Sequence, residues 1–389
     1  MVDRKSANSE TKGISMIRCR VCVLPSTKPD LEFTDGVCSA CTAYAQRQEI
    51  DWAARKEDLL KLLDRHNGDV LVPSSGGKDS TYQVLKLIEL GAKPLVVTAT
   101  TCMLTSVGRR NIDNLARYAT TIEVSPNKAV RAKLNRLGLT LVGDISWPEH
   151  VAIFTTPFKV AVAMGIPLIF YGENPQNQYG GPLESQDAKT MTRRWVSEFG
   201  GFLGLRPADL VGQDGITAND MQHYMPPDPS DVERAGVEAH FLGQYLPWDS
   251  HRNEEAAIKA GMSLNTEDGT PDGEPAFPSP ANYWMGENLD NAMTGLHDHF
   301  MYRKFGYGRG CAQASVDIRS GEVSRAEALE WVLENDGAFP WFYMGVGYTE
   351  ALKQIGVDLH EMTGLLRRFT NWDLFVDDGC VRPKLKETA

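Results

Sequence analysis

The sequence lacks an apolar run of the kind that crosses a membrane. A spanning helix needs about 20 consecutive, mostly apolar residues. The best apolar stretch, Val160 to Tyr171, is shorter and is broken by Gly165 and Pro167. The first fifteen residues are polar and contain no apolar signal core. We therefore expect no membrane span, a loose tail over residues 1–16 and, by default, a cytoplasmic location.

An excess of positive charge is also missing. The 389 residues include 40 Lys and Arg against 51 Asp and Glu, which gives a formal net charge of −11. Proteins that wrap RNA or DNA usually present a basic face. The charge balance therefore argues against a nucleic-acid partner, and the composition is that of an ordinary soluble globular protein.

A Walker-type phosphate loop is absent, but another glycine-bearing turn links an apolar run to a helical pattern. The residues VPSSGGKDS, Val72 to Ser80, contain Gly76 and Gly77. Two glycines let the backbone turn tightly and approach a ligand, and N–H groups at the start of the following helix attract an anion. Asp79 is an unusual neighbour for phosphate unless Mg²⁺ lies between them. The turn therefore predicts a phosphate site that also uses Mg²⁺.

Short apolar strands alternate with helical patterns from about residue 68 to 180. This alternation predicts an α/β fold with a parallel sheet covered on both faces. Ligands of such sheets bind beyond the carboxyl ends of the strands, where the glycine turn, residues 98–101 and residues 171–174 all lie. After residue 180, proline- and glycine-rich loops separate shorter helical patterns. We expect a tail over 1–16, a cysteine-bearing lobe over 17–50, an α/β domain over 51–180 and a mostly helical region over 181–389.

Seven cysteines are present, and four of them form two CxxC pairs near the N-terminus. Fifteen residues separate the pairs. In a reducing compartment, four thiolates at this spacing predict a closed, tetrahedral and therefore structural Zn²⁺ site. An iron–sulfur cluster is the alternative, because four cysteines also bind such clusters. The expected ligands are Cys19, Cys22, Cys38 and Cys41.

The segment SGGKDS resembles the PP-loop of the ATP pyrophosphatase superfamily. Members split ATP between its α- and β-phosphates, transfer AMP to a carbonyl-type oxygen and hold the pyrophosphate in this loop. The resemblance implies a sheet of the adenine nucleotide α-hydrolase-like type, with ATP and Mg²⁺ as ligands. It implies that the nucleotide and its pyrophosphate are bound by Ser75, Gly76, Gly77, Asp79, Ser80, Thr98 and Gly172. Superfamily members often add basic residues from late in the sequence, so the candidate catalytic residues are Lys78, Asp79, Lys304 and Arg309.

Nearly the full chain from Arg18 is similar to the N-acetyl sugar amidotransferases of bacterial surface-polysaccharide biosynthesis, which includes lipopolysaccharide biosynthesis. The similarity rests on RCRVCVLP, GVCSACTAY, LVPSSGGKDSTYQ, IPLIFYGENPQNQYGG and GLHDHFMYRKFGYGR, among other segments. It implies that the acetamido oxygen of a free or nucleotide-linked sugar is adenylylated. Ammonia then displaces AMP and gives an acetamidino sugar. The resemblance also implies that a separate glutaminase with a cyclase-like subunit supplies the ammonia, and the lack of a glutaminase nucleophile elbow in this sequence agrees with that division of labour.

Other polar residues are candidates for substrate contact. Glu173 and Asn174 follow an apolar strand, Tyr179 lies in the ensuing loop, and His150 lies in the segment SWPEH. His297 and His299 are two positions apart, but no third metal ligand is evident beside them. We therefore interpret this pair as ordinary polar or core histidines.

Two other functions stay open. Some PP-loop enzymes insert sulfur, and Cys311 or Cys102 could then relay a persulfide to a small molecule. A non-catalytic nucleotide-binding protein is the lesser alternative, and it would bind nucleotide without turnover.

Overall fold

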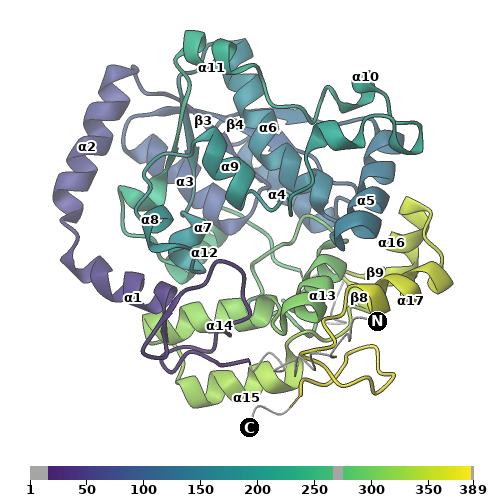
Figure 1. Ribbon diagram of the computed structural model, residues 1–389. Coiled ribbons are helices and arrows are strands. Elements are labelled where there is room, and N and C mark those ends of the chain that lie inside the picture. Colours follow the sequence, from purple (N-terminus) through teal and green to yellow (C-terminus); the bar gives the residue numbers. More distant parts are fainter. Residues whose placement is uncertain (1–15, 266–274, 387–389) are drawn as a thin grey trace, which may run out of the picture.

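Five parallel strands form the central sheet, in the order β5-β4-β3-β6-β7 (Figure 1). The computed structural model describes residues 16–265 and 275–386 of the chain. Leu71, in the central strand, lies opposite Leu95 on one side and Ile169 on the other. The predicted α/β fold with a parallel sheet is therefore confirmed. The strands are β3 (Asp69–Pro73), β4 (Lys93–Ala99), β5 (Thr120–Val124), β6 (Leu168–Tyr171) and β7 (Glu238–Phe241).

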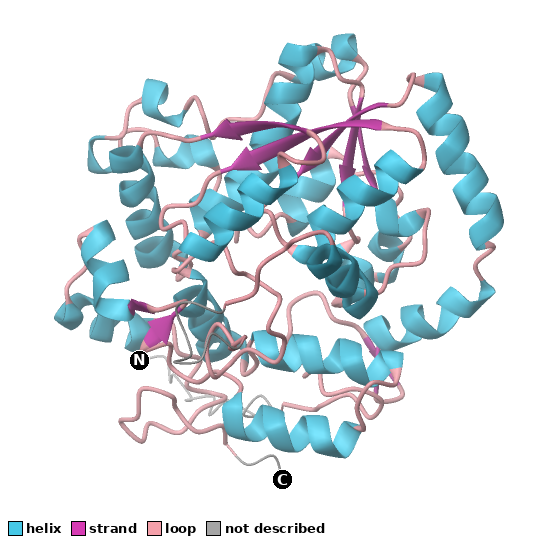
Figure 2. Ribbon diagram, turned by 180° about the vertical axis from the view of Figure 1, so that it is seen from behind, coloured by secondary structure: helices cyan, strands magenta, loops and turns pink. Residues whose placement is uncertain are grey.

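Helices cover both faces of this sheet (Figure 2). Val70 and Val72 pack into a core with α2 (Trp52–Arg65), α3 (Lys78–Glu89) and α4 (Ser106–Leu115). Leu71, between them, packs on the opposite face with α6 (Trp147–Met164) and α9 (Arg193–Phe199). Because successive side chains of a strand point to opposite faces, burial on both sides explains why β3, β4 and β6 are mostly apolar.

The sheet continues beyond residue 180, where we expected it to end. β7 is a fifth strand that pairs with β6, with Ala239 opposite Ile169. Its sequence, Glu-Ala-His-Phe, is too short and too polar to stand out as a strand. The buried His240 is tolerated there because its Nδ1 lies 2.8 Å from the Tyr245 hydroxyl and forms a hydrogen bond with it.

The chain after β6 is mostly helical, as predicted. Short helices first surround the sheet, and α12 then packs on α3 (Figure 1). A capping box is present at Ser324, because the Ser324 hydroxyl accepts a hydrogen bond from the backbone of Glu327. These helices are α7 (Pro175–Gln178), α8 (Leu183–Gln186), α10 (Ala218–Met221), α11 (Pro229–Ala235), α12 (Ser250–Lys259), α13 (Thr294–Phe305), α14 (Arg309–Ser320), α15 (Arg325–Asn335), α16 (Tyr348–Ile355) and α17 (Leu359–Arg368). Within residues 16–265 and 275–386, four 3₁₀ turns occur, at Arg47–Glu49, Pro207–Leu210, Gln213–Gly215 and Leu242–Gln244, and a small hairpin joins β8 (Phe342–Tyr343) to β9 (Val346–Gly347).

The cysteine-bearing lobe packs against the C-terminal region instead of standing alone. It contains β1 (Phe33–Thr34), β2 (Val37–Cys38) and α1 (Ser39–Gln46), and α1 lies near α14 in Figure 1. The Arg325 guanidinium, from α15, donates hydrogen bonds to the backbone carbonyls of Cys19 and Cys22. The two ends of the chain therefore share one hydrophobic core, which also contains Tyr307, Cys311 and Val332.

The C-terminal helices also contact the α/β part. Leu139, from α5 (Lys128–Val142), joins a core with α13, α16 and α17. The Arg136 guanidinium donates two hydrogen bonds, of 2.9 and 3.0 Å, to the Glu361 carboxylate.

The expected N-terminal tail lies outside the described residues, apart from Met16. Among the helices that the structure describes, none has the length and apolar character needed to cross a membrane.

Candidate functional site

The glycine turn joins β3 to α3 with a geometry that only glycine allows. Gly76 has a φ of +81°, and a Cβ added there would lie 2.7 Å from the Ile112 nitrogen. The turn is held by its own hydroxyls, since Ser74 Oγ accepts from the Gly76 N–H at 2.9 Å and donates to Ser80 Oγ at 2.8 Å. Gly77 is the N-cap of α3 and has no side chain to bond the first helical N–H groups. Those groups are left available to an anion.

A cleft of about 370 Å³ opens above this turn. The chain runs outward from β3 to β5 on one side and to β6 and β7 on the other, so the strand order reverses between β3 and β6. Ligands of open α/β sheets bind in the crevice at such a reversal, beyond the carboxyl ends of the strands. The cleft is bordered by nine of the predicted site residues: Ser75, Gly77, Lys78, Asp79, Ser80, Gly172, Glu173, Tyr179 and Arg309.

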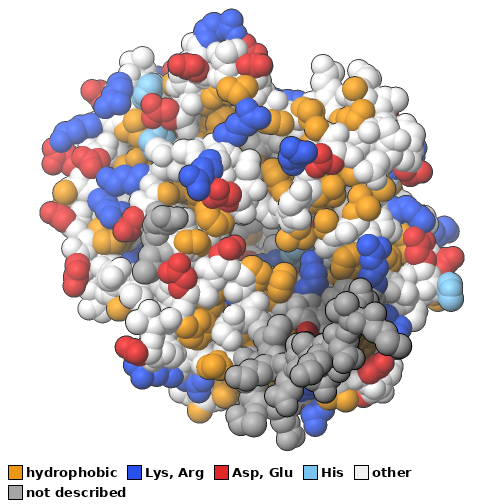
Figure 3. Space-filling model, in the orientation of Figure 1, with side chains coloured by type: hydrophobic (Ala, Val, Ile, Leu, Met, Phe, Trp, Pro, Cys, Tyr) orange, Lys and Arg blue, Asp and Glu red, His pale blue; other side chains and the backbone are white. Residues whose placement is uncertain are grey.

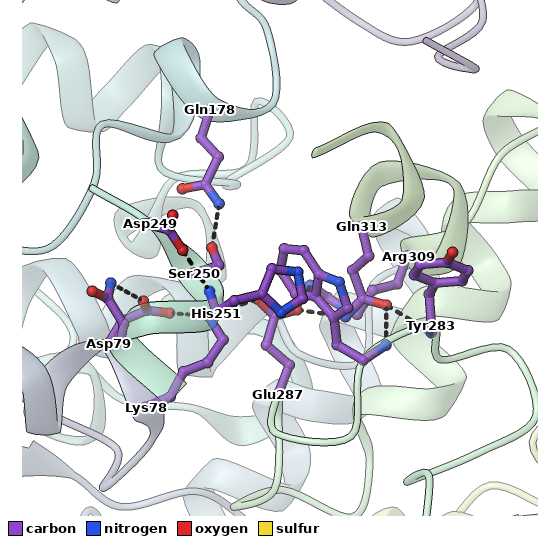
Figure 4. A network of polar contacts seen from close by, with 12 residues as sticks. Lys78, Asp79, Gln178, Asp249, Ser250, His251, Tyr283, Glu287, Arg309 and Gln313 are labelled. Atoms are coloured by element: carbon purple, nitrogen blue, oxygen red, sulfur yellow. Dashed lines mark hydrogen bonds and ion pairs between the residues drawn. The ribbon is translucent and has the colours of Figure 1, made fainter. Parts of the chain in front are cut away.

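Lys78 lies at the floor of the cleft, and its side chain is only 3% exposed. Its ammonium nitrogen is 2.6 Å from Asp79 Oδ2 and 3.6 Å from Glu287 Oε1 (Figure 4). It also lies 5.2 Å from the centre of the Trp284 ring. Burial opposes the charge of Lys78, but the carboxylates of Asp79 and Glu287 outweigh burial and raise its pKa above the usual value. Lys78 is therefore a fixed cation beside the glycine turn.

Arg309 is the second cation of the cleft, and it begins α14. Its Nε lies 2.9 and 3.0 Å from the two carboxylate oxygens of Asp298, and its Nη1 lies 3.9 Å from Glu287 Oε2. Glu287 also accepts a hydrogen bond of 2.6 Å from Gln313 Nε2 (Figure 4). Glu287 therefore connects Lys78, on α3, with Arg309 and Gln313, on α14.

Carboxyl groups outnumber cations in the cleft. Charges of both signs are interspersed over the face in Figure 3, whereas the cleft is lined by five carboxyl groups and two cations. Burial, followed by the charge of Asp79, raises the pKa of Glu173 to about 7. Mg²⁺ commonly binds one or two carboxylates together with substrate phosphates. Asp79, Glu173 and Glu287 all line the cleft, so each is a carboxyl group that could contribute to holding Mg²⁺ with a polyphosphate.

The sequence did not direct us to Glu287 or to the rest of its loop. This loop contributes Gly286, Glu287, Asn288 and Asp290 to the cleft. It is fixed against the segment that follows β4, where the Thr105 N–H donates to Asp290 O at 3.1 Å and the Ala292 N–H donates to Met103 O at 3.0 Å. One signal could have found it: the tripeptide Gly-Glu-Asn occurs at residues 172–174 and again at 286–288.

Five predicted residues do not line the cleft, and one of them, Gly76, lies within the glycine turn itself. Thr98 is buried in β4, although its neighbours Val97 and Ala99 line the cleft. Asn174 organises the loop after β6, because its side chain caps α7 and donates to the Ser185 and Gln186 carbonyls. The Lys304 ammonium donates instead to the Val142 carbonyl, at the end of α5. His150 lies beside Asp144 and His297.

The two cysteines considered for sulfur transfer do not line the cleft either. Cys311 is fully buried in the core under the cysteine lobe, and burial raises the pKa of its thiol to about 12. Cys102 packs at the edge of the core formed by α13, α16 and α17, and burial raises its pKa to about 11. Both thiols are therefore poor nucleophiles at neutral pH.

The four N-terminal cysteines converge as predicted and are buried. The Sγ atoms of Cys19 and Cys41 are 3.9 Å apart, and those of Cys22 and Cys38 are 3.6 Å apart. Zn–S bonds of about 2.3 Å in a tetrahedral site place the sulfurs about 3.8 Å apart. The four ligand atoms all lie within 4.8 Å of one another. The arrangement is therefore compatible with a single Zn²⁺ ion.

Comparison with known families finds a match to the C-terminal region. Residues 279–386 match the family described as "LPS biosynthesis protein WbpG-like, C-terminal domain". No curated protein matches the chain. The matched stretch contains α13 to α17 and supplies Glu287 and Arg309 to the cleft. Residues 279–386 are therefore similar to a WbpG-like C-terminal domain, which agrees with the predicted connection with lipopolysaccharide biosynthesis.

Proposed function

We propose that this protein is an ATP-dependent amidotransferase that acts on an N-acetylated sugar. It adenylylates the acetamido oxygen, releases pyrophosphate and lets ammonia displace AMP, which gives an acetamidino sugar. The single observation that carries the proposal is the turn at residues 74–80, which opens into an acidic cleft at the reversal of the strand order. The match of residues 279–386 to a lipopolysaccharide-biosynthesis family supports a sugar as the second substrate.

The residues of the cleft suit the first step, in which the sugar oxygen attacks the α-phosphorus of ATP and pyrophosphate leaves. Negative charge then grows on the pyrophosphate. The free N–H groups at the start of α3 and the buried cation of Lys78 lie where they can stabilise that charge. Arg309 reaches the same cleft from the C-terminal domain. Mg²⁺ bound at the carboxylates would neutralise the phosphate oxygens that the two cations do not reach.

The second step needs an amide oxygen that has become a good leaving group. Once that oxygen is part of AMP, ammonia can add to the carbon and expel AMP. No cysteine has to touch the carbon, which agrees with the burial of Cys311 and the position of Cys102 outside the cleft. We therefore favour ammonia over a sulfur nucleophile. We propose that a separate glutaminase, with a cyclase-like subunit, supplies this ammonia in the cell.

Product analysis tests the proposal directly. The purified protein, with Mg²⁺, ATP and ammonium at alkaline pH, is incubated with free and nucleotide-linked N-acetylated sugars, and AMP, pyrophosphate and product mass are measured. We expect AMP and pyrophosphate in equal amounts, and a product slightly lighter than its substrate because NH replaces O. A heavier, sulfur-containing product would contradict the ammonia step but not the ATP chemistry.

Asp79→Ala should abolish formation of AMP and pyrophosphate. Asp69→Ala is the matched control, because Asp69 is exposed at the opposite end of the same strand and should leave turnover unchanged. Retained zinc and an unchanged unfolding temperature would show that both variants are folded. Normal pyrophosphate release by folded Asp79→Ala would rule out the PP-loop assignment.

A further inference from the structure

Three potential metal ligands gather outside the cleft. Asp144 lies between α5 and α6, His150 is in the first turn of α6, and His297 is in the first turn of α13. One ligand atom from each lies within 4.8 Å of the other two. The sequence gives no hint of this cluster, because Asp144 and His297 are 153 positions apart.

The distances within the cluster point to more than an ion pair. His297 Nδ1 lies 2.7 Å from Asp144 Oδ1, which a hydrogen bond alone explains. His150 Nδ1 lies 3.2 Å from Asp144 Oδ2, yet this buried nitrogen has no hydrogen-bond partner among the described residues. Two ligands on one tetrahedral ion, with bonds of about 2.0–2.2 Å, lie about 3.3 Å apart. The His150 contact therefore has the separation expected for two atoms that share a metal ion.

The backbone at Gly201 approaches the unpartnered nitrogen closely. Gly201 faces His150 with a φ of +76°, and a Cβ at Gly201 would lie only 3.1 Å from His150 Nδ1. The rings of His150 and His297 are edge to face, with their centres 5.0 Å apart. Asp144 is 2% exposed, whereas the side chains of His150 and His297 are 25% and 20% exposed. The cluster is therefore held from the inside by a buried carboxylate and is reachable from solvent at its imidazoles.

We propose that Asp144, His150 and His297 bind a divalent first-row transition-metal ion, of which Zn²⁺ is the simplest candidate. Two imidazoles and one carboxylate are a common donor set for such ions, and three protein ligands leave a coordination position open. This distinguishes the site from the four-cysteine site, whose ligands close the coordination shell. The open position would take water or an oxygen atom of a small ligand.

The ion would also join the two halves of the molecule beside the cleft. Asp144 and His150 belong to the α/β part, and His297 belongs to the WbpG-like domain. Glu149 precedes His150 and lines the cleft, and Asp298 follows His297 and holds Arg309 there. The ion therefore bridges α6 and α13 directly behind the residues that border the cleft. This role does not depend on the reaction that we propose for the cleft.

Metal counting tests the proposal without any assay of turnover. The full-length protein is saturated with Zn²⁺, freed of excess by gel filtration and analysed for bound zinc. We expect two ions per chain in the wild type and one in His150→Gln and in His297→Gln. The affinity of the second ion should fall by more than the roughly 10–100-fold that follows loss of an outer-shell partner. His360→Gln is the matched control, because His360 is exposed on α17, and it should keep both ions.

Substitution with Co²⁺ tells the two sites apart. Thiolate ligands give Co²⁺ an intense charge-transfer band that an imidazole and carboxylate site lacks. Both variants should keep that band and lose only the weaker absorption of the second ion. A single ion per wild-type chain at saturating Zn²⁺ would overturn the proposal, as would a second ion that both variants retain with unchanged affinity. If His297→Gln does not fold, His150→Gln decides, because His150 Nδ1 makes no hydrogen bond that the fold needs.

Discussion

Gly76→Ala is the most direct test of the glycine turn, because two separate costs can be read from the structure. The first cost is conformational, since a φ of +81° is left-handed and costs an L-residue about 1–2 kcal/mol. The second is steric, because the added Cβ would lie 2.7 Å from the Ile112 nitrogen and 2.8 Å from the Asn111 carbonyl carbon. These are backbone atoms of α4, which cannot rotate away as a side chain does.

The chain offers a matched control in Gly91→Ala. Gly91 has a φ of +86°, but nothing lies within 4 Å of a Cβ added there. This variant carries the conformational cost alone, about 1–2 kcal/mol. Overpacking typically adds about 1–3 kcal/mol, so Gly76→Ala should lose about 2–5 kcal/mol. The difference between the two variants isolates the contact between the turn and α4.

Urea unfolding and AMP formation are the two assays. The unfolding midpoint should fall in both variants and fall further in Gly76→Ala. AMP formation should stay close to wild type in Gly91→Ala and drop about 100-fold in Gly76→Ala, because a displaced turn misplaces the N–H groups that face the phosphates. Equal stabilities of the two variants would refute the steric argument. Unchanged AMP formation in Gly76→Ala would refute the role of the turn.

Three further outcomes are expected. Cys22→Ser should lose the zinc of the four-cysteine site and have a lower unfolding temperature. Cys380→Ser, which changes an exposed thiol, should keep one zinc ion at the four-cysteine site. Equal zinc contents in the two variants would speak against a metal at the four cysteines. The raised pKa of Glu173, about 7, means that this carboxyl is protonated below pH 7, so the affinity for Mg²⁺ and ATP should rise as pH increases through 7, and Glu173→Gln should flatten this rise in a calorimetric titration. The effect of pH on folding stability has the opposite sign. A carboxyl group whose pKa is raised by folding favours the folded state at low pH, and this contribution is lost as the pH rises from the ordinary pKa of the group towards 7. Arg309→Gln should slow pyrophosphate release by at least tenfold. Lys304→Met should leave it nearly unchanged, because the Lys304 ammonium donates to the Val142 carbonyl outside the cleft. A larger loss in Lys304→Met than in Arg309→Gln would contradict our placement of the two cations.

Lys304 and Arg309 show a feature that the sequence alone could not predict. Lys304 and Arg309 are five positions apart, and their sequence context suits both equally to a polyphosphate. Lys304 lies in the last turn of α13, and Arg309 begins α14 after a reversal at Gly306, whose φ is +76°. Because the chain breaks between the two helices, the direction of each side chain is set by its own helix. Spacing along the chain could not tell which of the two would face the cleft.

The sequence by itself determined the features that are local. The glycine turn at 74–80, the four apolar strands β3 to β6 and the two CxxC pairs are short patterns whose geometry follows from backbone freedom, side-chain alternation and thiolate chemistry. Tertiary structure alone decided the features that join distant segments. It placed Glu287 against Lys78, brought Asp144 and His150 to His297, added β7 to the sheet and packed the cysteine lobe on α14 and α15. The physical reason is that such contacts depend on which faces of the elements pack together, and a local pattern shows that a face is buried without showing which partner buries it.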